Sequence, residues 1–64
     1  MVTSGVAERV LRLRARMHLS QAELAARVGV DQATISRWEA GERAPRNAAR
    51  VRLEGLMEKS DGQE

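Results

Sequence analysis

The chain contains no cysteine, phenylalanine or tyrosine, and it has only one tryptophan and one proline among its 64 residues. Without cysteine it can form neither a disulfide framework nor a thiolate metal site, so a small unaided core and a reducing cytoplasm are expected. No apolar run approaches the roughly 20 residues of a membrane-spanning helix. The N-terminus also lacks the basic segment and long apolar run of a secretory signal. Neither a membrane protein nor a secreted one is indicated.

A second set of absences argues against an enzyme. The sequence shows no Ser/His/Asp arrangement, no paired acidic cleft and no phosphate-binding loop. Its only histidine, His18, has no second histidine and no cysteine with which to hold a metal. A domain of this size buries only about 60% of its unfolded surface, which leaves no room for a deep substrate cavity. We therefore expect no catalytic residues, no metal and no small-molecule cofactor.

Charge is distributed unevenly along the chain. Residues 1–57 carry ten arginines against six acidic residues, whereas residues 58–64 carry one lysine against three acidic residues. A basic body with a short acidic tail suits a polyanionic partner such as nucleic acid. The excess of arginine over lysine favours planar, bidentate donors, although the codon usage of a GC-rich genome gives the same ratio.

The spacing of apolar residues predicts a first helix over residues 5–17. Its stripe recurs every three or four positions and consists of Val6, Val10, Leu13 and Met17. We expect Thr3 or Ser4 to cap this helix after a flexible segment, 1–4. His18 should end it, since histidine tolerates the left-handed conformation found just past a helix end.

Two short helices should follow, over about 21–28 and 32–39. Ser20 and Glu23 form a capping box, in which each side chain accepts a hydrogen bond from the other residue's backbone N–H. Gly29 supplies the positive φ that closes the first of these helices. Asp31 is a good N-cap for the second, and its charge favours the positive helix end. On that helix, Ile35 and Trp38 are three residues apart and should face inward.

A fourth helix is expected over about 46–58. Gly41 ends the preceding helical region, and Pro45 in the loop 42–45 can lead into a new helix. The expected apolar contacts of the fourth helix are Val51, Leu53, Leu56 and Met57. Gly55 should bend or shorten it, and residues 59–64 should form a frayed acidic tail. With no alternation at period two, the expected fold is all-α, a compact four- to five-helix bundle whose domain covers residues 5–58.

Two helices joined by a short turn containing glycine form a helix-turn-helix motif. With Ile35 and Trp38 turned inward, the opposite face of the same helix presents four side chains to solvent, those of Gln32, Ala33, Ser36 and Arg37. Glutamine can pair bidentately with adenine and arginine with guanine, while an alanine methyl can meet a thymine methyl. This face is therefore suited to reading base edges in duplex DNA.

Over about residues 6–57, the sequence resembles the lambda-repressor/Cro-like (XRE) helix-turn-helix family. The matching positions are Arg14, Leu19–Ala25, Val28–Val30, Thr34–Glu39, Gly41 and Pro45. The sequence departs from the family in two ways. It ends before a clear fifth helix, which the family commonly uses to pack the core and to dimerise, and His18 stands where many members have glycine.

The resemblance implies a lambda-repressor-like bundle whose second motif helix enters the major groove. It places five residues at base-reading or adjacent positions: Gln32, Ala33, Thr34, Ser36 and Arg37. It places Gln21 on a phosphate, and Arg43 and Arg46 on phosphate or the minor groove. It also implies an ion pair between Arg14 and Glu39 that holds the recognition helix in place.

The predicted function is that of a small bacterial or phage transcriptional regulator, acting as a repressor on a double-stranded DNA operator. Activation is an open alternative, and so is a protein-interaction module of the same fold, such as an antitoxin-like or anti-repressor subunit. High affinity would need two protomers on a pseudo-palindromic site, with the fourth helix around Leu56 and Met57 as the dimer surface. The expected location is cytoplasmic, on the nucleoid.

Some positions have a simpler interpretation. The arginines of the first helix, Arg9, Arg12 and Arg16, are expected to be a solvated face with local pairs such as Glu8–Arg12. Trp38 is expected in the core rather than stacked on bases. Arg50 and Arg52 fit a phosphate contact and an exposed helix face equally well.

Overall fold

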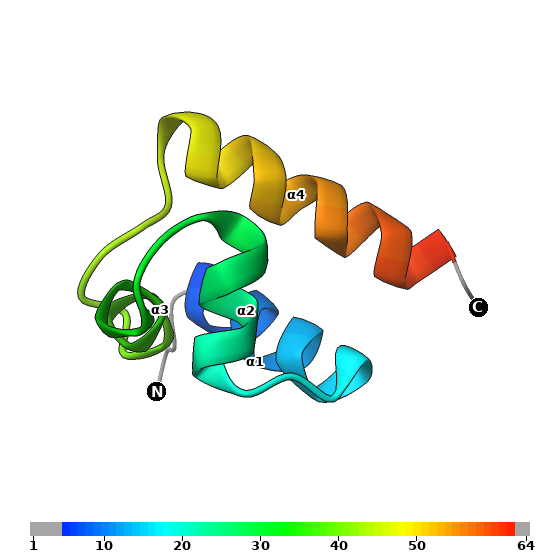
Figure 1. Ribbon diagram of the computed structural model, residues 1–64, viewed down its shortest axis with the longest axis horizontal. Helices are drawn as coiled ribbons and strands as arrows, with labels where there is room; N and C mark the ends of the chain where they lie inside the picture. Colours follow the sequence, from blue (N-terminus) through cyan, green and yellow to red (C-terminus); the bar gives the residue numbers. More distant parts are fainter. Residues whose placement is uncertain (1–4, 63–64) are drawn as a thin grey trace.

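Four α-helices account for most of residues 5–62, the part of the chain that this computed structural model describes (Figure 1). They are α1 (Gly5–Met17), α2 (Gln21–Val28), α3 (Gln32–Glu39) and α4 (Asn47–Gly62). The described residues contain no strand, and the all-α prediction is confirmed. The expected flexible segment and its cap at Thr3 or Ser4 lie outside the described residues.

The turn between α1 and α2 runs as the sequence predicts. His18 adopts a left-handed conformation, with φ of 57°. The backbone N–H of Leu19 then donates to the carbonyl of Arg14 at 2.9 Å, which closes the end of α1. The capping box starts α2 at once: the N–H of Glu23 donates to Ser20 Oγ at 3.0 Å, and the N–H of Ser20 donates to Glu23 Oε1 at 2.8 Å.

Gly29 connects the two helices of the motif. Its φ is 85°, and its N–H donates to the carbonyl of Ala25 at 2.8 Å. A Cβ at this position would lie 2.6 Å from Nη1 of Arg52, which itself donates to the carbonyl of Val28 at 3.3 Å. The left-handed backbone conformation therefore favours glycine here, whereas the flexible Arg52 side chain could move aside for a Cβ.

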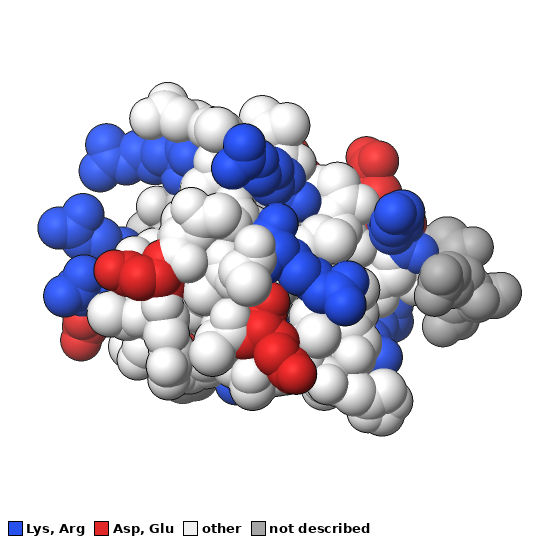
Figure 2. All heavy atoms as spheres, viewed as in Figure 1, with Lys and Arg blue, Asp and Glu red and all other residues white. Residues whose placement is uncertain are grey.

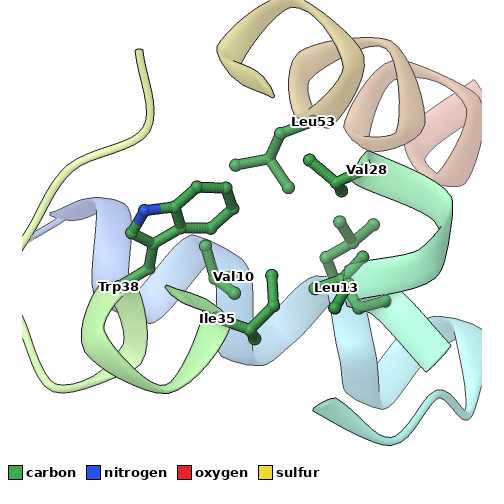
Figure 3. Packing of buried hydrophobic residues seen from close by; sticks show 8 residues of the cluster. Val10, Leu13, Val28, Ile35, Trp38 and Leu53 are labelled. Atoms are coloured by element: carbon green, nitrogen blue, oxygen red, sulfur yellow. The ribbon is translucent and has the colours of Figure 1, made fainter. Parts of the chain in front are cut away.

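The core lies where all four helices meet (Figure 3). Ile35 and Trp38 of α3 point toward α1, and the tryptophan is only 3% exposed. The short helix α3 packs on both α1 and α2, and α4 lies across those same two helices. The buried cluster consists of Val10, Leu13, Leu24, Ala25, Val28, Ile35, Trp38 and Leu53. A helix of eight residues is unstable alone in water, so this packing is what holds α2 and α3 in shape.

The last helix begins close to its predicted start but extends beyond its predicted end. It begins at Asn47, which has a φ of 55°, and it continues to Gly62 instead of ending near 58. Residues 59–62, expected in a frayed tail, are therefore helical. Gly55 does not end the helix, because a penalty of about 1 kcal/mol is too small to stop a helix anchored by packing on both sides. The ends of helices are the part of secondary structure that sequence determines least.

The expected core contact at Val51 is wrong, since this side chain is 70% exposed. Leu53 is buried, and Leu56 and Met57 pack against the core from half-buried positions. The reason is helical geometry: each residue turns the helix by about 100°, so Val51 and Leu53 point in directions roughly 200° apart. Leu56 and Met57, three and four residues after Leu53, return to its face. Among residues 5–62, no helix is long and apolar enough to cross a membrane.

Candidate nucleic-acid interface

One face of α3 is exposed and polar, while the opposite face is buried. Gln32, Ala33, Ser36 and Arg37 are all exposed to solvent. The buried residues of this helix are Ile35 and Trp38. The four side chains that could enter a groove are thus not covered by the chain's own packing.

Asp31 fixes the N-terminal end of α3. Its Oδ1 accepts from the backbone N–H of Thr34 at 2.9 Å and from the Thr34 hydroxyl at 2.6 Å. The hydrogen bonds from the side chain and then the backbone of Thr34 hold the pKa of Asp31 below its ordinary value. Thr34 is half-buried, and its hydroxyl proton is donated within this cap. Both the backbone N–H and the hydroxyl of Thr34 are therefore engaged by the Asp31 carboxylate.

Gln21, at the start of α2, is held between two other side chains. Its amide nitrogen donates to Oε1 of Glu39 at 2.8 Å, and its amide oxygen accepts from the amide nitrogen of Gln32 at 3.2 Å. The side chain is half-buried. Since the amide nitrogen has a second proton, Gln21 can still donate to a phosphate while it holds Gln32 in place.

The structure brings Arg14 and Glu39 together, the two residues that the resemblance paired. Nε of Arg14 lies 2.5 Å from Oε2 of Glu39, and Nη2 donates to Oε1 at 3.1 Å. The third donor of the same guanidinium, Nη1, reaches the carbonyl of Leu19 at 3.1 Å. Such bidentate pairs combine strength with a fixed geometry. The pair connects α1 to the C-terminal end of α3.

This pair is largely removed from solvent, with side-chain exposures of 23% for Arg14 and 8% for Glu39. Burial acts to raise the pKa of Glu39, but the hydrogen bonds from Arg14 and Gln21 outweigh it and lower that pKa below its ordinary value. The hydrogen bond to Glu39 in turn raises the pKa of Arg14. Both groups are therefore charged near neutral pH.

Together these contacts form a continuous chain of side chains from Arg14 through Glu39 and Gln21 to Gln32. All four residues are candidates from the sequence, but the two contacts that Gln21 makes were not predicted. These partners lie 18 and 11 residues away along the chain, and no local pattern signals them. The consequence is that Gln32 projects from α3 with its amide oriented before any ligand arrives.

The loop after α3 is tied to the end of that helix. The backbone N–H groups of Glu42 and Arg43 both donate to the carbonyl of Arg37, at 2.9 and 3.4 Å. The side chains of Arg43 and Arg46 are exposed. Figure 2 shows basic side chains gathering over this loop and the first turns of α4, along the left and upper edges of the view. The start of this loop is therefore fixed to the last turn of α3, and its two arginines are exposed to solvent.

The structure shows the surroundings of the residues that have a simpler interpretation. Arg50 pairs with Glu54 at 3.1 Å on the exposed face of α4, while Arg52 caps the end of α2. The expected pair between Glu8 and Arg12 is not formed among the described residues, although both side chains are exposed. The indole of Trp38 belongs to the core and is not available for stacking on bases. Within residues 5–62, no cluster of three or more His, Cys, Asp or Glu residues could hold a metal ion.

A family model described as helix-turn-helix matches residues 10–54, well over half of the chain and a span that includes every candidate residue from Arg14 to Arg46. The chain has no significant match among curated proteins or among solved structures.

Proposed function

The chain belongs to the Cro/C1-type helix-turn-helix (XRE) family of DNA-binding regulators, and from this premise we propose that it binds a specific double-stranded operator through α3 and represses transcription there. The observation that carries the proposal is the exposed polar face of α3, backed by a buried apolar face. A helix with these two faces can lie in the major groove while the bundle keeps its core.

Base recognition is assigned to the exposed side chains of α3. Gln32 suits adenine, because an amide can donate to and accept from the N6/N7 edge together, and Arg37 suits guanine O6/N7. Ala33 and the methyl of Thr34 suit the thymine methyl, and Ser36 can donate or accept. The hydrogen bond from Gln32 to Gln21 supports this role, since it fixes the amide orientation before binding. A side chain held in place loses less conformational entropy when it meets a base.

Phosphate contacts are assigned to the N-terminal end of α2 and to the loop after α3. In the capping box, Ser20 and Glu23 satisfy each other's backbone N–H groups, whereas those of Gln21 and Ala22 have no partner among the described residues. Free N–H groups and the positive end of a helix attract a phosphate. Arg43 and Arg46 would make further contacts to phosphate or the minor groove, and affinity should then fall with salt.

A single module of this kind buries about 600–1,000 Å² on DNA, which limits its affinity. We therefore assign the regulator a homodimeric form on a pseudo-palindromic site, with half-sites about one helical turn apart. We propose a cytoplasmic location, in a bacterium that either encodes the regulator itself or is infected by a phage that encodes it. No catalytic step and no cofactor enter this function.

Selection from a random duplex library, followed by fluorescence anisotropy at about 50 and 200 mM salt, tests the proposal. We expect a short enriched consensus, a mirrored arrangement of half-sites, and affinity that falls steeply with salt. Absence of an enriched sequence, or of DNA binding at the lower salt, would contradict it. That result would favour a protein-interaction module built on the same fold.

A further inference from the structure

A groove follows the seam between α1 and α4. It consists of two adjoining hollows, with volumes of about 160 and 270 Å³, which share Arg9 and Met57. No residue of α2 or α3 lines either hollow. The lining residues come from α1, from α4 and from the loop that precedes α4. The groove is therefore separate from the face that we assign to base reading.

The floor and the edge of this groove differ in chemistry. The accessible apolar surface of the groove comes from the half-buried Val6 and Met57, and beneath them lie Leu13 and Leu53 of the core, each only 2% exposed. Along one edge, Arg9, Arg12 and Arg16 lie three and four residues apart and share one face of α1. On the other side, Arg50 is already paired with Glu54. The groove thus combines an apolar floor with a strongly basic edge.

Two of the edge arginines lack a counter-charge. Neither Arg9 nor Arg12 has a hydrogen bond or ion pair within residues 5–62, and the nearby Glu8 does not pair with Arg12. Arginines on successive turns of one helix repel each other. An occupant with carboxylates beside an apolar stripe would relieve this repulsion and cover the floor at the same time.

We propose that this groove docks an acidic amphipathic helix of a partner protein. Along α1 the lining runs from Val6 to Arg16, which at 1.5 Å per residue is about 15 Å, or roughly three helical turns. A helix of that length would place its apolar stripe over Met57 and its carboxylates along the arginine edge, the general mode of helix-in-groove recognition. The partner would bind while α3 stays free for DNA.

Two other occupants fit less well. A DNA backbone would meet the arginines but has no apolar surface for the floor. A second copy of this chain would need an exposed apolar stripe flanked by acidic residues. Its exposed large hydrophobic residues in the described part are Leu11 and Val51, and each has arginine as a direct neighbour in the sequence. The basic edge would then face further arginines, so the homodimer proposed on DNA would pair through a surface other than the Met57 side of α4 that the sequence suggested.

The test is a selection of random peptides of about 16 residues, displayed on their own mRNA, for binding to the immobilised 64-residue chain. Enriched peptides should be acidic, with leucine or a similar residue at helical spacing, and should bind equally well when operator DNA is present. Lack of enrichment, enrichment of basic or non-amphipathic peptides, or competition with DNA would overturn the proposal.

Two variants of equal net charge locate the site. In Arg9→Gln/Arg12→Gln the basic edge is lost, whereas Arg27→Gln/Lys59→Gln removes two exposed charges that do not line the groove. We expect the first variant to weaken the selected peptide by about fivefold to thirtyfold, the upper range for two exposed ion pairs, and the second by less than about twofold. Equal losses would overturn the proposal.

A third variant, Met57→Ala, should weaken the same peptide through the floor of the groove, with circular dichroism confirming that the variant is folded. Unchanged peptide affinity in that folded variant would count against the docking mode.

DNA binding of the same variants is measured in parallel. If the Arg9/Arg12 variant lost DNA affinity well beyond the Arg27/Lys59 variant, the arginine edge would belong to the DNA surface, and the partner helix would be excluded. If the selection for operator DNA gave no enriched sequence, the peptide measurements would be unaffected, so each proposal can be rejected independently of the other.

Discussion

The ion pair between Arg14 and Glu39 should contribute strongly to stability, and Glu39→Gln tests this with little change in shape. The substitution removes the charge but keeps an oxygen that can accept from Gln21. A hydrogen bond to a charged group contributes about 1.5–3 kcal/mol. Because the Arg14 side chain is 23% exposed and can regain water, we take the lower half of that range, about 2 kcal/mol. For a domain of this size, such a loss lowers Tm by roughly 8–16 °C.

Glu54→Gln is the matched control, since it makes the same chemical change in an exposed ion pair. Glu54 is 49% exposed and its partner Arg50 is 66% exposed. Exposed pairs at this helical spacing contribute about 0.3–0.5 kcal/mol, so Tm should fall by only about 1–4 °C. Thermal melts followed by circular dichroism compare the two. Equal decreases in Tm for Glu39→Gln and Glu54→Gln would refute the argument that burial makes the first pair the stronger one.

The same pair gives the protein a specific response to acid. The pKa of Glu39 is lower in the folded protein than its ordinary value of 4.5. Stability from this group is therefore fully present above pH 4.5 and is lost as pH falls through the lower folded-state pKa. The wild type should therefore lose more stability than Glu39→Gln as the pH falls below about 4.5. Parallel pH profiles for the two proteins would contradict this assignment.

Three further substitutions test the motif and its proposed contacts. Arg37→Ala should reduce the discrimination between bases at one position of the operator by about 1–3 kcal/mol, as measured by competition binding, and should leave Tm unchanged. A Tm lowered by many degrees would show that Arg37 is structural. Arg43→Ala should weaken all duplexes alike and reduce the slope of log affinity against log salt by about 1; a loss restricted to one operator variant would argue against a phosphate contact. Gly29→Ala should destabilise the fold by more than about 1 kcal/mol, because the residue has a φ of 85°, which alanine adopts only with strain. A melt equal to the wild type would show that the turn tolerates a side chain.

Local interactions explain why the first three helices could be predicted closely. The capping box of Ser20 and Glu23, the cap at Asp31 and the positive φ of Gly29 each depend on residues no more than four positions apart. The physics of such short-range contacts is the same in a peptide as in the folded protein. The exposed face of α3 followed from the same kind of argument, since Ile35 and Trp38 define its inner side.

Contacts between distant parts of the chain decided the rest. Sequence alone determined the helix-turn-helix, its caps and the composition of its outer face, because those depend on neighbours along the chain. It could not place Val51 outside the core, since the direction of α4 depends on how Leu53 packs against helices that fold elsewhere. Nor could it show the hydrogen bond between Gln21 and Glu39 or the groove along α1 and α4. Those features exist only once packing sets the distances between helices, because a contact across 18 or more residues leaves no periodic trace in the sequence.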